Sequence, residues 1–157
     1  MNSESYEGTS PALSSLVWWR RFPSTPRTVT AARRATRAAL AGWGVEGEGV
    51  ANAALVVSEL VTNAVRHGHV PGRLVELRIT YDLEKTVTVE VSDAGDGRPP
   101  LAGVGPAETA LAESGRGLAL VEGFADAWGV RDRVIGKTVW ARLLVGTSRT
   151  QMTSTCP

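Results

Sequence analysis

The chain contains 157 residues, 43% of them hydrophobic, which is enough for one globular domain with a normal core. Its 17 basic and 16 acidic residues give a net charge of +1, so charge gives no reason to expect nucleic acid or an anionic membrane as the main partner. Cys156 is the only cysteine, which excludes an intrachain disulfide and a cysteine metal cluster. The start of the chain lacks a signal-peptide pattern and no apolar run reaches ~18 residues, so we expect a cytoplasmic protein.

Both ends of the chain are rich in small and polar residues and show no hydrophobic period. We therefore expect residues 1–15 to form a flexible N-terminal arm and residues 147–157 to form a flexible C-terminal tail. Residues 16–146 are expected to form the single folded domain.

The folded part is expected to begin with a strand and a helix. Residues 16–22 predict the strand, in which the adjacent Trp18 and Trp19 must face opposite sides. The helix that follows is predicted to run to residue 40. The residues expected to start and stop it are Ser24 or Thr25 as the cap, Pro26 at the first position, and Gly42 and Gly44 at the end.

Residues 53–68 predict a second helix with two unlike faces. At roughly 100° per residue, Glu59, Asn63 and Arg66 form one narrow stripe opposite an apolar face. A carboxylate, a carboxamide and a cation so close together could provide a proton acceptor, a metal-binding oxygen and a phosphate partner. The same residues are ordinary on solvated helix surfaces, which is the alternative. The opposite face consists of Val57, Leu60, Val61 and Ala64.

Strict alternation of apolar residues in 75–81 and 87–91, joined by a short polar connection, predicts an antiparallel hairpin with one buried face. The second strand leads into Asp93, Gly95 and Gly97. Glycines let a backbone approach a ligand, and a carboxylate at a strand end could accept a hydrogen bond from an exocyclic amine. An ordinary turn uses the same residues, so the motif alone leaves both interpretations open.

Residues 98–114 are rich in glycine, proline and alanine, which is typical of a flexible lid. Gly115 and Gly117 are expected to form a loop that enters a helix over residues 118–124. Free N–H groups at the start of that helix would suit phosphate, and an unremarkable helix start is the alternative.

The last two strands are predicted over residues 128–131 and 139–145. Between them Lys137 is interpreted as a turn residue, and Thr138 as facing the base of the hairpin, with a ligand contact as the less favoured role. A phosphate-binding P-loop is excluded because position 131 is Arg where that motif requires glycine. The order of elements predicts an α+β fold, a two-layer α/β sandwich whose mostly antiparallel, mixed sheet carries helices on one face.

Taken together, four ordered motifs resemble the histidine-kinase-like (GHKL) ATPase superfamily of gyrases, heat-shock chaperones, histidine kinases and mismatch-repair ATPases. The one-domain length, the second helix and the Ser-Gly-Arg-Gly-Leu segment are most similar to anti-sigma-factor serine/threonine kinases of bacterial partner-switching systems. The resemblance implies a Bergerat-type ATP-binding fold. The motifs are Glu59-Leu60-x-x-Asn63-Ala64-x-x-His67, Asp93-x-Gly95-x-Gly97, Gly115-x-Gly117 and Gly136-x-Thr138.

The resemblance also implies roles for individual residues. Asn63 would bind Mg²⁺, Glu59 would act as general base or orient the nucleophile, and Asp93 would receive the adenine amino group of ATP. His67 would support the helix end rather than bind a ligand, and Arg66 is a secondary candidate for phosphate. The remaining expected nucleotide contacts are Gly95, Gly97, Gly115, Arg116, Gly117, Leu118 and Thr138.

The function implied by the resemblance is an ATP- and Mg²⁺-dependent serine/threonine kinase that phosphorylates an anti-sigma-factor antagonist and sequesters a sigma factor, as a homodimer. No direct nucleic-acid or membrane contact is expected. A nucleotide-gated binding module without phosphotransfer is one alternative. A detached histidine-kinase-type catalytic domain is another, although His67 and His69 lie in the expected nucleotide site. The residues that could belong to either core or contact surface are Trp18, Trp19, Trp43, Trp128 and Trp140.

Overall fold

The computed structural model describes residues 15–82, 84–95 and 111–146, except for the side chains of residues 111–117. Residues 1–14 of the expected arm, the tail, Gly97 and residues 98–110 of the expected lid lie outside these residues, and Ser15 belongs to the first strand. The described elements, in chain order, are β1 (Ser15–Pro23), α1 (Arg27–Gly42), α2 (Glu48–His67), β2 (Leu74–Asp82), β3 (Thr86–Asp93), α3 (Leu111–Phe124), β4 (Ala127–Asp132) and β5 (Lys137–Leu144).

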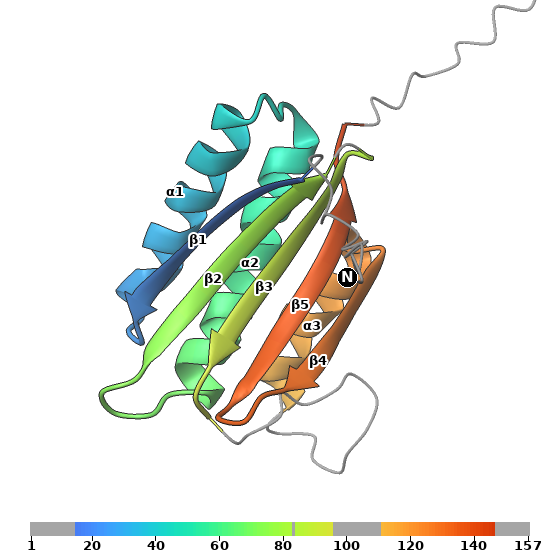
Figure 1. The fold of residues 1–157 in the computed structure, drawn as a ribbon. Helices are drawn as coiled ribbons and strands as arrows, with labels where there is room; N and C mark the ends of the chain where they lie inside the picture. The colour runs from blue at the N-terminus through green and yellow to red at the C-terminus, as the bar shows by residue number, and fades with distance from the viewer. Residues whose placement is uncertain (1–14, 83, 96–110, 147–157) are drawn as a thin grey trace, which may run out of the picture.

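The strands form one five-stranded sheet in the order β1-β2-β3-β5-β4. All four pairings are antiparallel. Figure 1 shows the three helices together behind one face of this sheet, which confirms the two-layer α+β architecture. Within the described residues the sheet contains no parallel pair, so the mixed component of the expectation is not seen there. The described residues also include no helix long and apolar enough to cross a membrane.

Alternating apolar residues of the strands make the core. Their side chains face the helices, and α2 lies at the centre, where it packs against α1, α3 and three strands. Burying a valine or leucine side chain contributes about 1.5–3 kcal/mol, so this layer holds the ends of β3 and β5 firmly in register. The buried hydrophobic residues of the sheet are Phe22, Val75, Leu77, Ile79, Val87, Val89, Val91, Val139, Ala141 and Leu143.

Helix starts differ most from the sequence prediction. Helix α2 begins at Glu48 instead of residue 53, after Gly47 with φ 81°. The expected side-chain cap of α1 by Ser24 or Thr25 is wrong, since Pro26 occupies the cap position and makes no side-chain cap hydrogen bond. The loop before α1 is instead tied down by the Thr28 hydroxyl, which donates to the carbonyl of Pro23.

The tryptophans divide between the core and the surface. Trp18, Trp43 and Trp128 pack against the core, and the ring of Trp43 stacks on Tyr81 with centroids 6.4 Å apart. Trp19 is exposed on β1. The half-buried Trp140 lies over a glycine of the neighbouring strand, where an added Cβ on Gly129 would be 3.0 Å from the indole.

Candidate functional site

Helix α2 carries the first group of expected site residues. Asn63 is only 8% exposed and Glu59 is half-buried, whereas Arg66 and His67 are exposed near the end of the helix. The solvated-stripe interpretation is therefore wrong for Asn63, because α2 is surrounded by other elements on most sides. The Nδ2 atom of Asn63 is buried without a hydrogen-bond partner among the described residues. An unpaired buried amide N–H costs about 1–3 kcal/mol, so this group requires an acceptor from a ligand or a water molecule.

Asp93, at the end of β3, lies in a cradle of glycines. A Cβ added to Gly68, which follows α2, would be 2.2 Å from the Asp93 carboxylate carbon. A Cβ on Gly95 would be 2.6 Å from the Cα of Gly68, and one on Gly136 would be 1.8 Å from the carbonyl oxygen of Asp93. Side chains at these three positions would overlap Asp93 or the backbone beside it, so the close packing here requires glycine. The end of α2 and the end of β3 thus meet at Asp93.

The carboxylate of Asp93 forms a buried ion pair with Lys137. The Lys137 ammonium donates to Oδ1 of Asp93 at 3.0 Å, and the two side chains are 5% and 2% exposed. The backbone N–H of Gly95 donates to the same oxygen at 2.9 Å. Strand pairing accounts for the contact, because Asp93 and Lys137 are direct partners across β3 and β5.

The interpretation of Lys137 as a turn residue is wrong. Gly136, with φ 76°, provides the positive φ that the turn needs, so β5 already begins at Lys137. Alternation along the strand could have revealed this orientation, since Val139, Ala141 and Leu143 face the core and Lys137 has the same parity.

Thr138 faces the other side of the sheet. Its hydroxyl lies 2.7 Å from the hydroxyl of Ser92, its direct partner on β3. Adjacent residues of a strand point to opposite faces, so Thr138 and Asp93 do not share a face. Thr138 was expected to contact the nucleotide, and the residue that lies beside the Asp93 carboxylate is Lys137.

The structure also alters the expected phosphate loop. Helix α3 begins at Leu111, so Gly115 and Gly117 lie within the helix and do not form a loop that enters it. Leu111, Ala112 and Glu113 favour helix, and they outweigh the cost of about 1 kcal/mol for each glycine. The Arg116 side chain lies outside the described part of the chain. Leu118 is fully buried.

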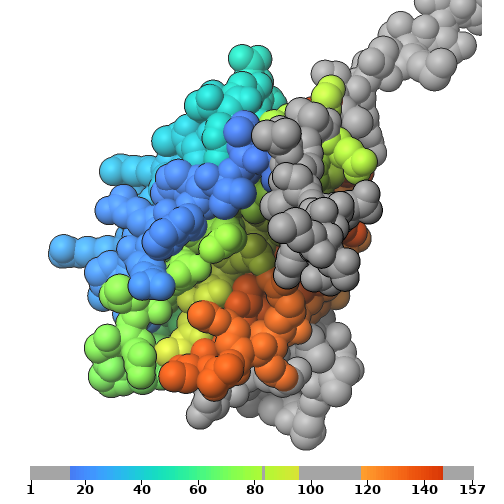
Figure 2. Space-filling view, in the orientation of Figure 1, coloured from blue at the N-terminus to red at the C-terminus, as the bar shows by residue number. Residues whose placement is uncertain are grey.

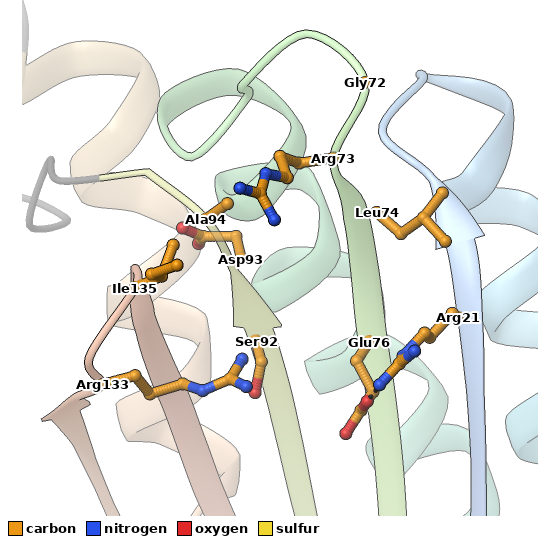
Figure 3. A pocket seen from close by; sticks show the side chains of 10 residues that line it. All are labelled: Arg21, Gly72, Arg73, Leu74, Glu76, Ser92, Asp93, Ala94, Arg133 and Ile135. Carbon is orange, nitrogen blue, oxygen red and sulfur yellow. Dashed lines mark hydrogen bonds and ion pairs between the residues drawn. The ribbon is translucent and has the colours of Figure 1, made fainter.

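A cavity of about 400 Å³ lies on the sheet face away from the helices, between the β2 side and the β4–β5 side (Figure 2). Figure 3 shows Arg21, Arg73 and Arg133 around it, with Arg21 Nε 3.1 Å from Glu76 Oε2. Asp93 is the one expected site residue in its lining, and the Asp93 carboxylate is beside Gly68 at the end of α2. We therefore do not assign this cavity to the expected nucleotide site.

The side chains of Glu59, Asn63 and Asp93 fit ATP and Mg²⁺ chemically. Asn63 offers an amide oxygen, a hard ligand of the kind that Mg²⁺ prefers, and Glu59, one turn away on α2, offers a carboxylate that can accept a proton. Asp93 offers a carboxylate acceptor at the end of β3.

Comparisons with known proteins agree with this fold. The family model described as the histidine kinase-like ATPase domain matches residues 22–143. No curated protein matches the chain. The crystal structure of the RsbU and RsbW domains of Rv1364c from Mycobacterium tuberculosis is 20% identical with a TM-score of 0.61, over 83% of this chain and 32% of that one.

A second solved structure, the histidine kinase domain from the Erythrobacter litoralis EL346 blue-light activated histidine kinase, is 25% identical with a TM-score of 0.49. The match covers 62% of this chain and 45% of that one. The chain spans about a third of the mycobacterial chain, and that similarity shows a shared fold. Because the family model covers most of the sequence, this chain belongs to the histidine kinase-like ATPase domain family.

Proposed function

We propose that the protein is a cytoplasmic, ATP- and Mg²⁺-dependent serine/threonine kinase and anti-sigma factor. It would phosphorylate an anti-sigma-factor antagonist, sequester a sigma factor and act as a homodimer. The observation that carries the ATP-dependent part is the Asp93 carboxylate, buried in a glycine cradle where α2 ends. The kinase class and the partners rest on the resemblance of the four motifs to anti-sigma-factor kinases.

Each residue has a defined task in this proposal. Asp93 accepts a hydrogen bond from the adenine amino group, Asn63 holds Mg²⁺ through its amide oxygen, and Glu59 prepares the substrate hydroxyl. The buried position of Asn63 supports its task, since a fixed amide is better placed for a metal than a mobile surface one. Arg66 and Arg116 are candidates to balance phosphate charge. Phosphoryl transfer depends mainly on positioning and charge stabilisation. A metal ligand, a general base and cations near the phosphates would therefore be sufficient for the reaction.

A comparison of Glu59→Gln with Asn63→Ala tests the proposal. The assay measures transfer of radiolabelled γ-phosphate to the cognate antagonist protein, and calorimetry measures ATP affinity with and without Mg²⁺. Glu59→Gln should keep ATP affinity and slow transfer roughly a hundredfold or more, the scale for losing a general base. Asn63→Ala should lower both transfer and the Mg²⁺-dependent part of ATP affinity.

Glu48→Gln is the matched control, because Glu48 is an exposed carboxylate on the same helix. Wild-type protein that binds ATP and its antagonist but never labels it would defeat the kinase proposal in favour of a nucleotide-gated module. An acid-labile phosphoryl product would instead favour the histidine-kinase class. Undiminished transfer by Glu59→Gln would remove Glu59 from the general-base role.

A further inference from the structure

The cavity on the sheet face away from the helices has a surplus of positive charge in its lining. Three arginines surround it, namely Arg21 at the end of β1, Arg73 just before β2 and Arg133 in the β4–β5 turn (Figure 3). Arg21 pairs with the Glu76 carboxylate at 3.1 Å. Arg73 and Arg133 have no ion pair or side-chain hydrogen bond with another described residue. Glu76 is the one lining carboxylate on this face, so the described lining carries an excess of two positive charges.

A pair of buried hydroxyl groups borders the cavity. Ser92, which belongs to the lining, is 9% exposed, and its hydroxyl lies 2.7 Å from that of Thr138, which is 7% exposed. One hydroxyl donates this hydrogen bond and the other accepts it, so the accepting group keeps an O–H donor. Among the described residues neither hydroxyl has a second side-chain partner. A buried donor without an acceptor is destabilising, so the pair favours a ligand or water that offers an oxygen.

The register of the sheet explains why these groups gather at one place. Residues that are direct partners in successive strands point to the same face of a sheet. One such row crosses β1, β2, β3 and β5 on the face away from the helices, where a ligand could contact several of its members. The row consists of Arg21, Glu76, Ser92 and Thr138.

Backbone hydrogen bonds hold the other two arginines in place at the edge of the cavity. The Arg73 N–H donates to the carbonyl of Val70 at 3.0 Å, and the Arg133 N–H donates to the carbonyl of Gly136 at 3.0 Å. Each arginine thus extends from a closed turn. Groups that are positioned before a ligand arrives bind it at a lower entropic cost.

We propose that this cavity binds a phosphomonoester dianion, carried either by a serine of a partner protein or by a small organophosphate. At pH 7 a phosphomonoester carries a charge of about −1.5 to −2, which matches the excess in the lining better than one carboxylate does. Its oxygens can accept from the forked guanidinium groups and from the free hydroxyl donor together. The cavity of about 400 Å³ also has room for the group that bears the phosphate, and Leu74 and Ile135, 52% and 56% exposed, offer that group apolar surface.

This site is separate from the proposed nucleotide site. Ser92 and Asp93 are consecutive residues of β3, so their side chains point to opposite faces of the sheet. The Asp93 carboxylate lies beside Gly68 at the end of α2, whereas the arginines line the other face. Phosphomonoester binding here therefore goes beyond the proposed kinase function and does not depend on it.

Calorimetry with glycerol 3-phosphate, a short peptide with a central phosphoserine, and succinate tests the site. The proteins are the wild type, Arg73→Gln, Arg133→Gln and the control Arg78→Gln, since Arg78 is an exposed arginine of β2 outside the lining. We expect each cavity variant to bind both phosphate probes roughly 10-fold or more weakly than the wild type, the scale of a charge-assisted hydrogen bond. Arg78→Gln should match the wild type, and succinate, a dicarboxylate, should bind the wild type more weakly than either phosphate probe.

Two results would overturn the inference outright. One is a wild type that binds neither phosphate probe, and the other is unchanged affinity in both cavity variants, which would place the ligand elsewhere. Succinate binding as tight as that of the phosphate probes would overturn the phosphomonoester class. Tighter binding of the phosphoserine peptide than of glycerol 3-phosphate would support a partner protein as the source, and the reverse order would support a small organophosphate.

The variants are expected to fold, because the side chains they change are exposed and make no contact that holds the described structure together. Equal urea unfolding midpoints for the wild type and the variants check this. The ATP-dependent function is tested separately by Glu59→Gln and Asn63→Ala, so its failure is distinguishable from failure of this site.

Discussion

Among the described residues, two ion pairs connect β3 to the C-terminal hairpin, and they differ mainly in their contact with water. Asp93 and Lys137 pair on the helix side with side chains 2% and 5% exposed. Glu90 and Arg131 pair on the opposite face with side chains 21% and 57% exposed. Water and salt screen the second pair, whereas each member of the first depends on its partner for solvation. Two ion pairs of a carboxylate and a cation on one strand therefore contribute very different free energies of stabilisation.

Breaking the buried pair should have the largest effect. Lys137→Met leaves the Asp93 carboxylate buried without its counter-charge, and we expect the free energy of unfolding to fall by about 3–5 kcal/mol. Urea denaturation measures the loss. The double variant Asp93→Asn/Lys137→Met should recover part of it, because no uncompensated charge remains. Additive losses in this double-mutant cycle would contradict a strong interaction between the two residues.

The glycine cradle can be probed with two glycines that share a backbone conformation. Gly72 and Gly136 both have φ 76°, but an added Cβ would meet nothing within 4 Å at Gly72 and the Asp93 carbonyl oxygen at Gly136. Gly72→Ala should cost about 1–2 kcal/mol from the left-handed backbone alone. Gly136→Ala should cost a further 1–3 kcal/mol, roughly the penalty of overpacking. Equal unfolding midpoints for the two variants would show that the cradle is loosely packed.

Breaking the exposed pair should have the smallest effect. Arg131→Ala and Glu90→Gln are each expected to lower the free energy of unfolding by about 1 kcal/mol or less. The loss should shrink further in 1 M salt, where screening acts over about 3 Å. Urea denaturation at low and high salt measures both effects. A loss as large as that of Lys137→Met would mean that exposure does not set the worth of these pairs.

Most of the fold could be predicted from the sequence because its strands are amphipathic. Val75, Leu77 and Ile79 alternate with polar residues, and that period marks both the strand and its buried face. Helix starts were less predictable. No side chain caps α1, although Ser24 and Thr25 are residue types that commonly do so. The glycines near the start of α3 indicated a loop, whereas the helix already begins at Leu111.

The candidate site was predictable in part. Asp93 could be singled out because its carboxylate stands at the end of a predicted strand and is followed by Gly95 and Gly97, although an ordinary turn uses the same residues. Lys137 escaped notice because a Gly-Lys-Thr segment between two strands is typical of a turn, and its ion pair joins residues 44 positions apart. The burial of Asn63 could not be predicted, because it depends on the elements that surround α2. Helical periodicity shows which residues share a face of α2, and it does not show what covers that face.

The register of β5 has a consequence for how the protein could change during evolution. The core residues Val139, Ala141 and Leu143 fix which face residue 137 occupies. An extra residue inserted near Gly136 would either move these side chains to the solvent face or be absorbed as a β-bulge. Substitution at position 137 meets no such barrier, since it leaves the alternation intact. A single codon change can therefore replace the chemical group beside Asp93. The direction in which that group points stays the same, because the register of the sheet determines it.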